Sequence, residues 1–413
     1  MIAERKILTI DIGTSSIRAA LTLLKGDKRQ TTLATSPSRG IKNGNIVNVP
    51  SAKDSLQSAL NKLKLEAPST VPTDAYVLVP GGCTLGYEVE AKISFPGIKT
   101  INYNDVNMVK NKVKDEIRRR RGLTVKNFYE IIHIIPQEFI VDNVDGIQNP
   151  IGHSGRALTM KAFVILASKA YLKTIDQLLK GAGLKLKGVV LQTLAALYSV
   201  RDEKTYFNNN LFIYLGAGNT EVLYLREDAP VFFKHEPFGS EDIIGFLLQK
   251  LKVSRKEAER LYREYGSAYA FNVNPEEVIT INYGTRALKV QKLVIPALIH
   301  LQLKGLVKDI KKALEAEDPT FLTHLNRVYI TGGASKLKDI DLLFGKLFKA
   351  PVVVAAPEGE FKDPALAPIE GVVNYVLSLN RRERLTDIKE DLTKDYGKTG
   401  LFSSFWRFIT QYI

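Results

Sequence analysis

Residues 6–24 read KILTIDIGTSSIRAALTLL, and this stretch decides how the fold is interpreted. An apolar segment, a turn of small residues around Gly13 and a second apolar segment form the pattern of a β-hairpin. Residues 211–225, LFIYLGAGNTEVLYL, repeat this pattern in the second half of the chain. Small residues in such turns let backbone N–H groups approach a phosphate without a Cβ in the way. The two hairpins therefore predict a nucleotide bound between two duplicated halves.

Length and composition narrow the class of protein. A chain of 413 residues exceeds what one hydrophobic core usually supports, so we expect two or more domains. The apolar content of 45% is typical of a soluble globular protein, and no apolar run approaches the roughly 18–20 residues that a membrane span needs. The first residues do not resemble a signal peptide. One cysteine, Cys83, and five scattered histidines argue against a disulfide framework and a His/Cys metal site, and fit a reducing cytoplasm.

The formal net charge of +14 indicates an anionic partner. Part of this charge lies in the basic segment 110–121, where apolar side chains recur at helical spacing: Val106, Val109, Val113 and Ile117. The lysines and arginines then cover the exposed side of an amphipathic helix, either as a solvated face or as a docking surface. No nucleic acid is expected as a partner, because neither an aromatic platform nor a recognisable binding motif accompanies the charge.

Strands and helices alternate in both halves, which predicts two α/β domains that face a cleft. The first domain is expected at 1–80, 167–205 and about 373–385. The second has its core at 206–238 and 323–372 and a subdomain at 239–322. The order of predicted elements changes at residues 81–166. One strand precedes the basic helix, at 87–95, and others follow it, at 129–135 with 139–141 and at 157–166. We expect an inserted α+β subdomain there.

Apolar periodicity predicts the other elements. Strands are expected at 74–79, 184–191, 328–330 and 352–355. Helices are expected at 51–65, 193–200, 293–314 and near 370–379, and a mostly helical stretch is expected at 241–265.

The last thirteen residues predict an amphipathic helix. At about 100° per residue, one side carries the apolar residues Leu401, Phe402, Phe405, Trp406, Phe408, Ile409, Tyr412 and Ile413, and the other side is polar and includes Arg407. Residues 386–400 are polar and contain two glycines, as expected of a linker. A helix of this kind after a tether favours an in-plane membrane anchor, and a terminal helix packed on the protein's own core is the alternative.

Five segments, in this order along the chain, resemble the sequence landmarks of the actin-like ATPase superfamily. They correspond to the first phosphate loop, the first connecting helix, the second phosphate loop, the adenosine loop and the second connecting helix, and they are residues 11–15, 191–193, 216–220, 331–334 and 370–371. The resemblance implies an α/β, actin-like fold: two duplicated α/β domains around a nucleotide cleft.

Other segments resemble one family within this superfamily, the FtsA proteins of bacterial cell division. They are residues 38–46 (SRGIKNGNI), 133–139 (HIIPQEF) and 142–152 (DNVDGIQNPIG). The insertion at 81–166 lies where that family carries its own subdomain, and the family ends in an amphipathic helix. The resemblance covers nearly the whole chain. It implies a protein that self-assembles into filaments and links the FtsZ ring to the anionic cytoplasmic membrane, peripherally at the division site, among other division proteins.

The resemblance also implies ATP and Mg²⁺ as ligands. The nucleotide-binding residues would be Asp11, Gly13, Thr14, Ser15, Ser16, Gln192, Gly216, Ala217, Gly218, Asn219, Gly239, Glu259, Gly332, Gly333 and Ala334. Asp11 would hold Mg²⁺ through water.

Two departures from the superfamily pattern bear on activity. The acid that begins the second phosphate loop in most relatives is replaced by Tyr214, and one glycine of that loop is Ala217. An uncharged phenol cannot serve as a carboxylate ligand to a cation at neutral pH. The Ala-Glu-x-x-Lys signature that holds ribose and base ends in Tyr262 instead of lysine. We therefore expect ATP to bind with at most weak hydrolysis, and we assign no catalytic residue.

Two other functions share parts of this pattern. Sugar kinases have the same clefted, duplicated fold, but no residue here is a clear catalytic base or forms a sugar pocket. The actin-like cytoplasmic component of type IV pili also has an inserted subdomain, but generally lacks a terminal amphipathic anchor.

Overall fold

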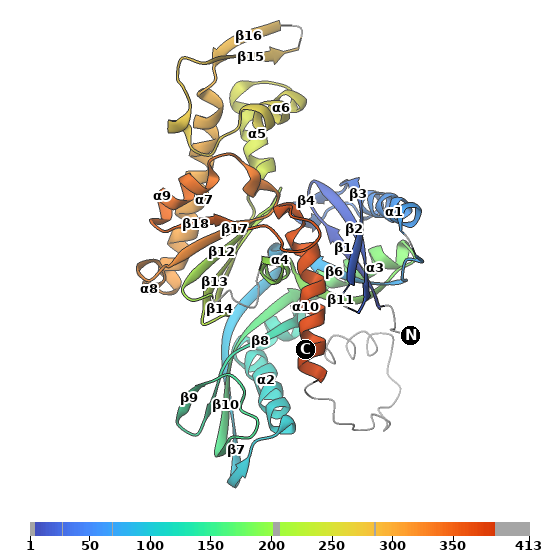
Figure 1. Ribbon diagram of the computed structural model, residues 1–413, viewed down its shortest axis with the longest axis vertical. Coiled ribbons are helices and arrows are strands. Elements are labelled where there is room, and N and C mark those ends of the chain that lie inside the picture. Colours follow the sequence, from blue (N-terminus) through green and yellow to red (C-terminus); the bar gives the residue numbers. More distant parts are fainter. Residues whose placement is uncertain (1–4, 27, 68, 201–206, 285, 385–413) are drawn as a thin grey trace.

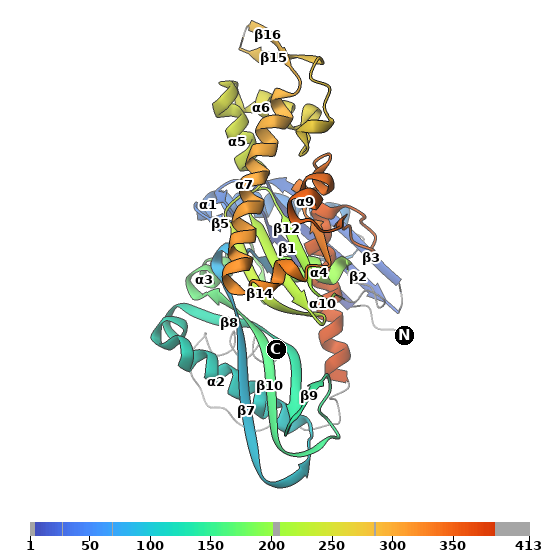
Figure 2. The same cartoon turned by 90° about the vertical axis from the view of Figure 1, so that its left-hand side faces the viewer.

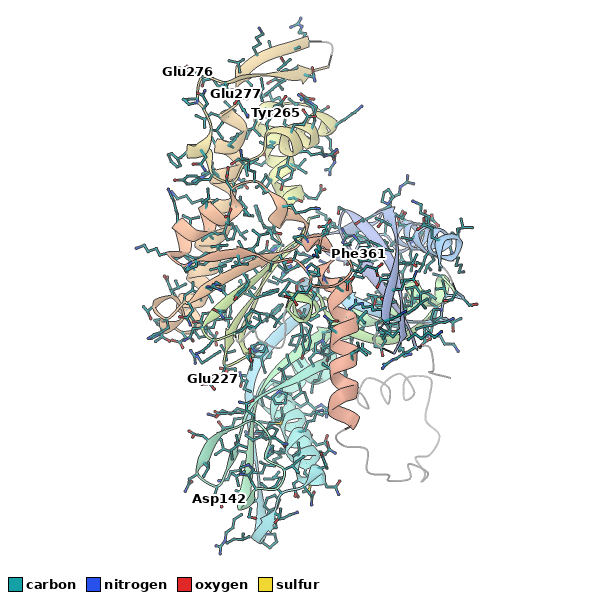
Figure 3. All side chains as sticks on the ribbon, viewed as in Figure 1. Asp142, Glu227, Tyr265, Glu276, Glu277 and Phe361 are labelled. Atoms are coloured by element: carbon teal, nitrogen blue, oxygen red, sulfur yellow. The ribbon has the colours of Figure 1, made fainter. Side chains whose placement is uncertain are left out.

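The computed structural model describes residues 5–26, 28–67, 69–200, 207–284 and 286–384 (Figure 1). The predicted linker at 386–400 and the predicted helix at 401–413 lie outside the described residues. Two sheets form the middle of the molecule. The side chains labelled in Figure 3 mark its two ends, with Asp142 on the inserted subdomain and Glu276 and Glu277 beside a hairpin at the opposite end.

The first sheet has the strand order β11-β6-β1-β2-β3. Its strands are β1 (Arg5–Ile12), β2 (Ser16–Lys25), β3 (Lys28–Pro37), β6 (Asp74–Val79) and β11 (Lys185–Leu191). The first three strands are antiparallel, and β6 and β11 run parallel to β1. Side chains alternate between its faces. Leu8 and Ile10 pack toward α1 (Val49–Glu66) and α3 (Lys169–Gly181), while Ile7 and Ala20 pack toward α10 (Ala367–Arg384).

The second sheet repeats this topology with the order β14-β13-β12-β17-β18. Its strands are β12 (Asn210–Leu215), β13 (Thr220–Arg226), β14 (Ala229–Glu236), β17 (Arg327–Thr331) and β18 (Val352–Val354). Again a three-stranded antiparallel unit is followed by two parallel strands. The predicted duplication into two α/β halves is confirmed.

Helices cover the second sheet and continue into a subdomain at the top of Figure 1. They are α5 (Ser240–Leu251), α6 (Arg255–Tyr265), α7 (Val294–Glu317), α8 (Thr320–Thr323) and α9 (Ile340–Phe348), and the hairpin of β15 (Val278–Tyr283) and β16 (Arg286–Gln291) lies at the far end. The stretch predicted as mostly helical is two helices. Lys252 adopts a left-handed conformation (φ 53°) that ends α5, and the Ser254 side chain accepts from the Glu257 N–H and caps α6.

The inserted subdomain has a sheet of order β7-β10-β8-β9 with one helix packed on it (Figure 2). Its elements are β7 (Thr84–Thr100), α2 (Tyr103–Phe128), β8 (Tyr129–Val141), β9 (Val144–Ile147) and β10 (Ser154–Ser168). Val109, Val113 and Ile117 are buried against the sheet, which confirms the helical spacing. The two strand pieces predicted around Pro136 are one strand. Its pairing with β10 shifts register beside Pro136, where the missing N–H is tolerated.

Two helices cross where the halves meet. The helix α4 (Gln192–Val200) follows β11 and contacts β12 and β13 of the second sheet, and α10 packs across it. A Cβ on Gly371 would lie only 1.6 Å from the Ala195 carbonyl oxygen, so the close crossing requires glycine. None of the described helices combines the length and apolar character needed to cross a bilayer.

Candidate functional site: a cleft between two phosphate-loop turns

The two predicted turns have the same backbone geometry. The first turn joins β1 to β2, and the Gly13 N–H donates to the Ser16 carbonyl at 3.1 Å. The second turn joins β12 to β13, and the Gly216 N–H donates to the Asn219 carbonyl at 2.8 Å. The turns also touch, because a Cβ on Gly218 would lie 2.7 Å from the Thr14 hydroxyl oxygen.

Both turns line one cavity of about 260 Å³. It is lined by twelve of the predicted nucleotide-binding residues: Asp11, Gly13, Thr14, Ser15, Ser16, Gln192, Gly216, Ala217, Gly218, Asn219, Gly333 and Ala334. A second cavity of about 960 Å³ adjoins it, and the predicted residue Glu259 is among the residues that line this cavity. The two cavities share Thr14, Ser15, Gly333 and Lys336.

Two predicted residues, Gly239 and Gly332, line neither of these cavities and support their walls instead. A Cβ on Gly239 would lie 2.4 Å from the Ala217 carbonyl carbon. Gly332 has a φ of +96°, and a Cβ there would lie 2.4 Å from the Leu215 carbonyl oxygen. Both glycines let backbone segments approach closely beneath the second turn.

The turns offer unpartnered hydrogen-bond donors to the smaller cavity. The backbone N–H groups of four turn residues donate to no acceptor within the described part of the chain. They are those of Thr14, Ser15, Ala217 and Gly218. The carbonyl groups of Gly216 and Ala217 are occupied, because they accept from N–H groups at the start of α5. Backbone N–H groups gathered around a small cavity are suited to an oxyanion such as a phosphate.

The acid beside these turns, Asp11, belongs to β1 and not to the turn. It is 2% exposed and pairs in register with Arg18 on β2. Arg18 Nη1 donates to Asp11 Oδ2 at 2.9 Å and to the Ala365 carbonyl at 3.2 Å. Burial raises the pKa of Asp11, and the charge of Arg18 opposes this rise. Our sequence reasoning missed Arg18, although the hairpin register places it opposite Asp11.

Gln192 joins Asp11 to the residue that replaces the usual acid. As the first residue of α4, it donates from Nε2 to Asp11 Oδ1 at 3.3 Å and to the Tyr214 hydroxyl at 3.1 Å. Burial raises the pKa of Tyr214, so the phenol stays uncharged. Tyr214 therefore fills the acid position without supplying charge.

The residues around the smaller cavity do not fit a metal ion held directly by side chains. Asp11 is the one carboxylate among the described residues that line this cavity, and both of its oxygens already accept hydrogen bonds. No group of three or more His, Cys, Asp or Glu side chains within the described ranges could hold a metal ion. The donors here suit an anion, and Mg²⁺ would have to enter bound to the phosphates of a nucleotide.

A second buried acid, Glu221, lies behind the turns and was also missed. Its Oε1 accepts from the Gly81 N–H at 2.6 Å, and its Oε2 accepts from the Thr193 N–H at 3.1 Å and from the Thr193 hydroxyl. Burial raises the pKa of Glu221 to about 7. One side chain on β13 therefore joins the start of α4 to the start of the inserted subdomain. The signal was an acid at the start of an apolar strand.

The larger cavity has a mixed lining whose charged side chains are mainly basic. Glu259 on α6 pairs with Arg255 at 2.8 Å. Tyr262, which replaces the expected lysine, also lines this cavity. The basic side chains in the lining are Lys42, Arg255, Arg263, Lys336 and Lys338, against three acids. This balance favours a ligand whose anionic part lies in the adjoining smaller cavity.

Two family models match the chain. The model described as "SHS2 domain inserted in FTSA" matches residues 81–166, and the one described as "Cell division protein FtsA" matches residues 211–371. The chain belongs to the FtsA family. The family predicted from the sequence is therefore confirmed, and the SHS2 match coincides with the sheet and helix of the inserted subdomain.

Curated members of the FtsA family align with nearly the whole chain. The cell division protein FtsA of Borreliella burgdorferi is 25% identical over 380 residues, which is 89% of this chain and 90% of that protein. The FtsA protein of Streptococcus pneumoniae is 26% identical over 365 residues, covering 87% and 78%.

Solved structures establish the fold expected for the FtsA family. The PilM–PilN type IV pilus biogenesis complex matches with a TM-score of 0.61 at 17% identity, covering 90% of this chain and 98% of the other. MreB5 of Spiroplasma citri bound to AMPPNP matches with a TM-score of 0.52 at 12% identity, covering 92% and 99%. The predicted actin-like fold with an inserted subdomain is therefore confirmed. At these identities the likeness concerns the fold alone.

Proposed function

We propose that this chain is a membrane-tethered, actin-like protein of cell division that binds ATP, self-assembles and anchors the FtsZ ring to the cytoplasmic face of the membrane. Membership of the FtsA family supports the role in division. The observation that carries the nucleotide proposal is the meeting of the two turns, with four unpartnered backbone N–H groups at one cavity.

ATP would lie with its phosphates in the smaller cavity and its nucleoside in the larger one. Asp11, Gln192 and the residues of both turns would surround the phosphates, and Glu259 and Gly333 lie where the nucleoside would bind. Arg18 and Lys336 line the phosphate end and would add positive charge. Mg²⁺ would accompany the phosphates, with Asp11 reaching it through water.

Hydrolysis would be slow. A carboxylate beside the phosphates can accept a proton from the attacking water, and the position of the usual acid holds instead a buried, neutral phenol, Tyr214. The remaining acid, Asp11, is paired with Arg18. The side chains at the phosphate end therefore support a protein that retains ATP.

The membrane, FtsZ and filament parts of the proposal rest on the family and on the sequence of the tail. The apolar side of residues 401–413 would insert among the lipid headgroups, with Arg407 near anionic lipids. Such a short helix binds weakly alone, so many tails aligned along a filament would bind far more strongly than one.

Electron microscopy of the protein with ATP on monolayers of anionic lipid tests this function. We expect membrane-bound filaments with ATP and sparse, unordered particles without it. A nucleotide-binding titration in the presence of Mg²⁺ accompanies it. Absence of both nucleotide affinity and filaments would overturn the proposal.

Gly218→Ala tests the meeting of the turns in the same titration. The added Cβ would clash with Thr14, so we expect ATP affinity to fall about tenfold or more. Gly97→Ala is the matched control, because a Cβ there meets nothing within 4 Å. Equal affinities for the two variants would show that the close contact is not needed.

A further inference from the structure

Residues 38–46, which resemble a segment of the FtsA family, include a short hairpin beside the cleft. It consists of β4 (Ile41–Lys42) and β5 (Asn45–Ile46), and its two-residue turn is Asn43-Gly44. Both turn residues have positive φ, 48° and 74°. An Asn-Gly pair is the preferred sequence for such a tight turn, so the hairpin is locally well specified.

The base of this hairpin is fixed to the first half of the molecule. Ile41 and Ile46 pack against the core of the first domain. The N–H groups of Val47 and Asn48 donate to the Gly40 carbonyl at 2.8 and 3.1 Å. The hairpin is therefore held as part of the first half, and its tip points to the cleft.

The tip contacts the first phosphate-loop turn. The Gly44 N–H donates to the Thr14 hydroxyl oxygen at 3.0 Å, and the Gly44 carbonyl accepts from the Tyr171 hydroxyl at 2.9 Å. Tyr171 is a buried residue of α3 that does not line either cavity. The backbone of Gly44 is thus held on both sides by groups of the first domain.

The same tip reaches across the cleft to the second turn. Gly218 lies so close that a Cβ there would be 3.0 Å from Asn43 Cα. When the Asn219 amide is oriented by its hydrogen-bond partners, its nitrogen donates to the Asn43 carbonyl at 2.9 Å. A Cβ on Gly44 would lie 2.3 Å from that amide and 2.8 Å from Pro80 Cβ.

We propose that the hairpin Ile41–Ile46 is a clasp that holds the second turn against the first and slows release of a bound nucleotide. Gly44 lines the smaller cavity, and Lys42 and Asn43 line the larger one, so the clasp lies where the cavities meet. It is an element of the first domain that bonds directly to the phosphate turn of the second. The effect on nucleotide release rests on the proposed function, whereas the contacts of the clasp with both turns do not.

Three single variants of the full chain test the clasp. Gly44→Ala places a methyl group against Asn219 and Pro80, and Tyr171→Phe removes one hydrogen bond to the clasp without touching the cavities. Gly183→Ala is the matched control, because Gly183 has a similar φ of +78° and a Cβ there meets nothing within 4 Å. Thermal melts establish that each variant is folded.

The first readout is the dissociation rate of a fluorescent ATP analogue. Loss of one hydrogen bond corresponds to about fivefold in Tyr171→Phe, and the larger disruption in Gly44→Ala should give about tenfold or more. Gly183→Ala should stay within about twofold of the unmodified chain. Unchanged dissociation in folded Gly44→Ala and Tyr171→Phe would overturn the clasp.

The second readout needs no nucleotide. Amide hydrogen exchange of the Gly216 N–H, which donates to the Asn219 carbonyl within the second turn, should be faster in Gly44→Ala and Tyr171→Phe than in the unmodified chain, and unchanged in Gly183→Ala. If the unmodified chain fails to bind the analogue, the proposed function fails, and this second readout alone decides the clasp. Equal exchange in all four proteins would refute it.

Discussion

At the scale of single residues, the pair of Asp11 and Arg18 dominates the candidate site. The two lie opposite each other in the first hairpin, with Arg18 Nη1 2.9 Å from Asp11 Oδ2 and the carboxylate almost fully buried. An ion pair of this kind contributes little if both partners are replaced together, but removing one partner leaves a buried charge unpaired. The pair therefore affects the stability of the folded chain, and its two charges also lie at the wall of the smaller cavity.

Arg18→Ala should lower the unfolding free energy by about 2–4 kcal/mol, because Asp11 loses its partner. It should also weaken ATP binding. The double variant Asp11→Asn with Arg18→Ala should recover part of the stability, since no buried charge then remains. Urea unfolding of the four proteins in the cycle measures this. Additive losses would show that the two side chains do not depend on each other.

Glu221 predicts how stability varies with pH. Because burial raises its pKa from 4.5 to about 7, the folded state holds this proton more tightly than the unfolded state. The stabilisation is complete below about pH 4.5 and is lost as the pH rises through 7, a loss of about 3 kcal/mol. Glu221→Gln should remove most of this dependence.

The difference between Glu221→Gln and the unmodified chain isolates this effect. Burial lowers the pKa of His133 to about 3 and that of His235 to about 4, and these groups act in the opposite direction, adding stability as the pH rises. Their contributions cancel when the two proteins are compared by denaturant unfolding at pH 5 and pH 8. A difference that stays constant between these pH values would contradict the assignment.

At the scale of elements, the crossing of α4 and α10 fixes how the two halves meet. Gly371 lies directly against the backbone at Ala195, with no room for a side chain. Gly371→Ala should therefore force the helices apart and lower stability by about 3 kcal/mol or more. In α7, a Cβ on Gly305 meets nothing within 4 Å, so Gly305→Ala should instead add about 0.5–1 kcal/mol.

Thermal unfolding of both variants checks the crossing. A melting temperature for Gly371→Ala at or above that of the unmodified chain would mean that the helices shift to make room. Gly305→Ala shows what the same chemical change does in an open helical position.

Regular elements could be predicted from the sequence because apolar periodicity reports burial. The strand predicted at 74–79 is β6 to the residue, and the helix predicted at 51–65 differs from α1 by one or two residues at its ends. Local chemistry explains the differences. The apolar pattern at 241–265 does not show that Lys252 takes the left-handed conformation that ends α5. Pro136 interrupts the apolar alternation of its segment, but the strand β8 continues through it.

The site was predicted less completely than the fold. The residues of the turns follow from local pattern, and twelve of the predicted nucleotide-binding residues line one cavity. Arg18 and Glu221 did not follow, because their roles depend on partners across a strand pair and across the domain junction. Gly239 and Gly332 were assigned to the ligand, while the structure places them behind the second turn.

At the scale of the whole molecule, two subdomains lie at opposite ends of the two central sheets. The inserted subdomain extends from one end and the subdomain with β15 and β16 from the other (Figures 1 and 2). Gln137 of the inserted subdomain donates to the Pro230 carbonyl at 2.9 Å, and the Gly81 N–H donates to Glu221 Oε1 at 2.6 Å. The insertion is therefore bonded to the second half as well as to the first.

Removal of residues 401–413 should separate folding from membrane attachment. We expect the truncated chain to keep its melting temperature and its nucleotide affinity, and to lose co-sedimentation with vesicles of anionic lipid. Attachment of the full chain should also rise steeply with protein concentration, because assembly multiplies weak single anchors. Undiminished co-sedimentation after truncation would refute the anchor.

The use of backbone donors in both turns has an evolutionary consequence. A side-chain substitution cannot delete a main-chain N–H group unless it introduces proline, so the donors themselves survive most mutations. Hydrolysis that depends on one carboxylate has no such protection, since a single nucleotide change converts an aspartate codon into a tyrosine codon. A change from aspartate to tyrosine at position 214 would therefore remove a carboxylate in one step and leave the backbone donors of both turns in place.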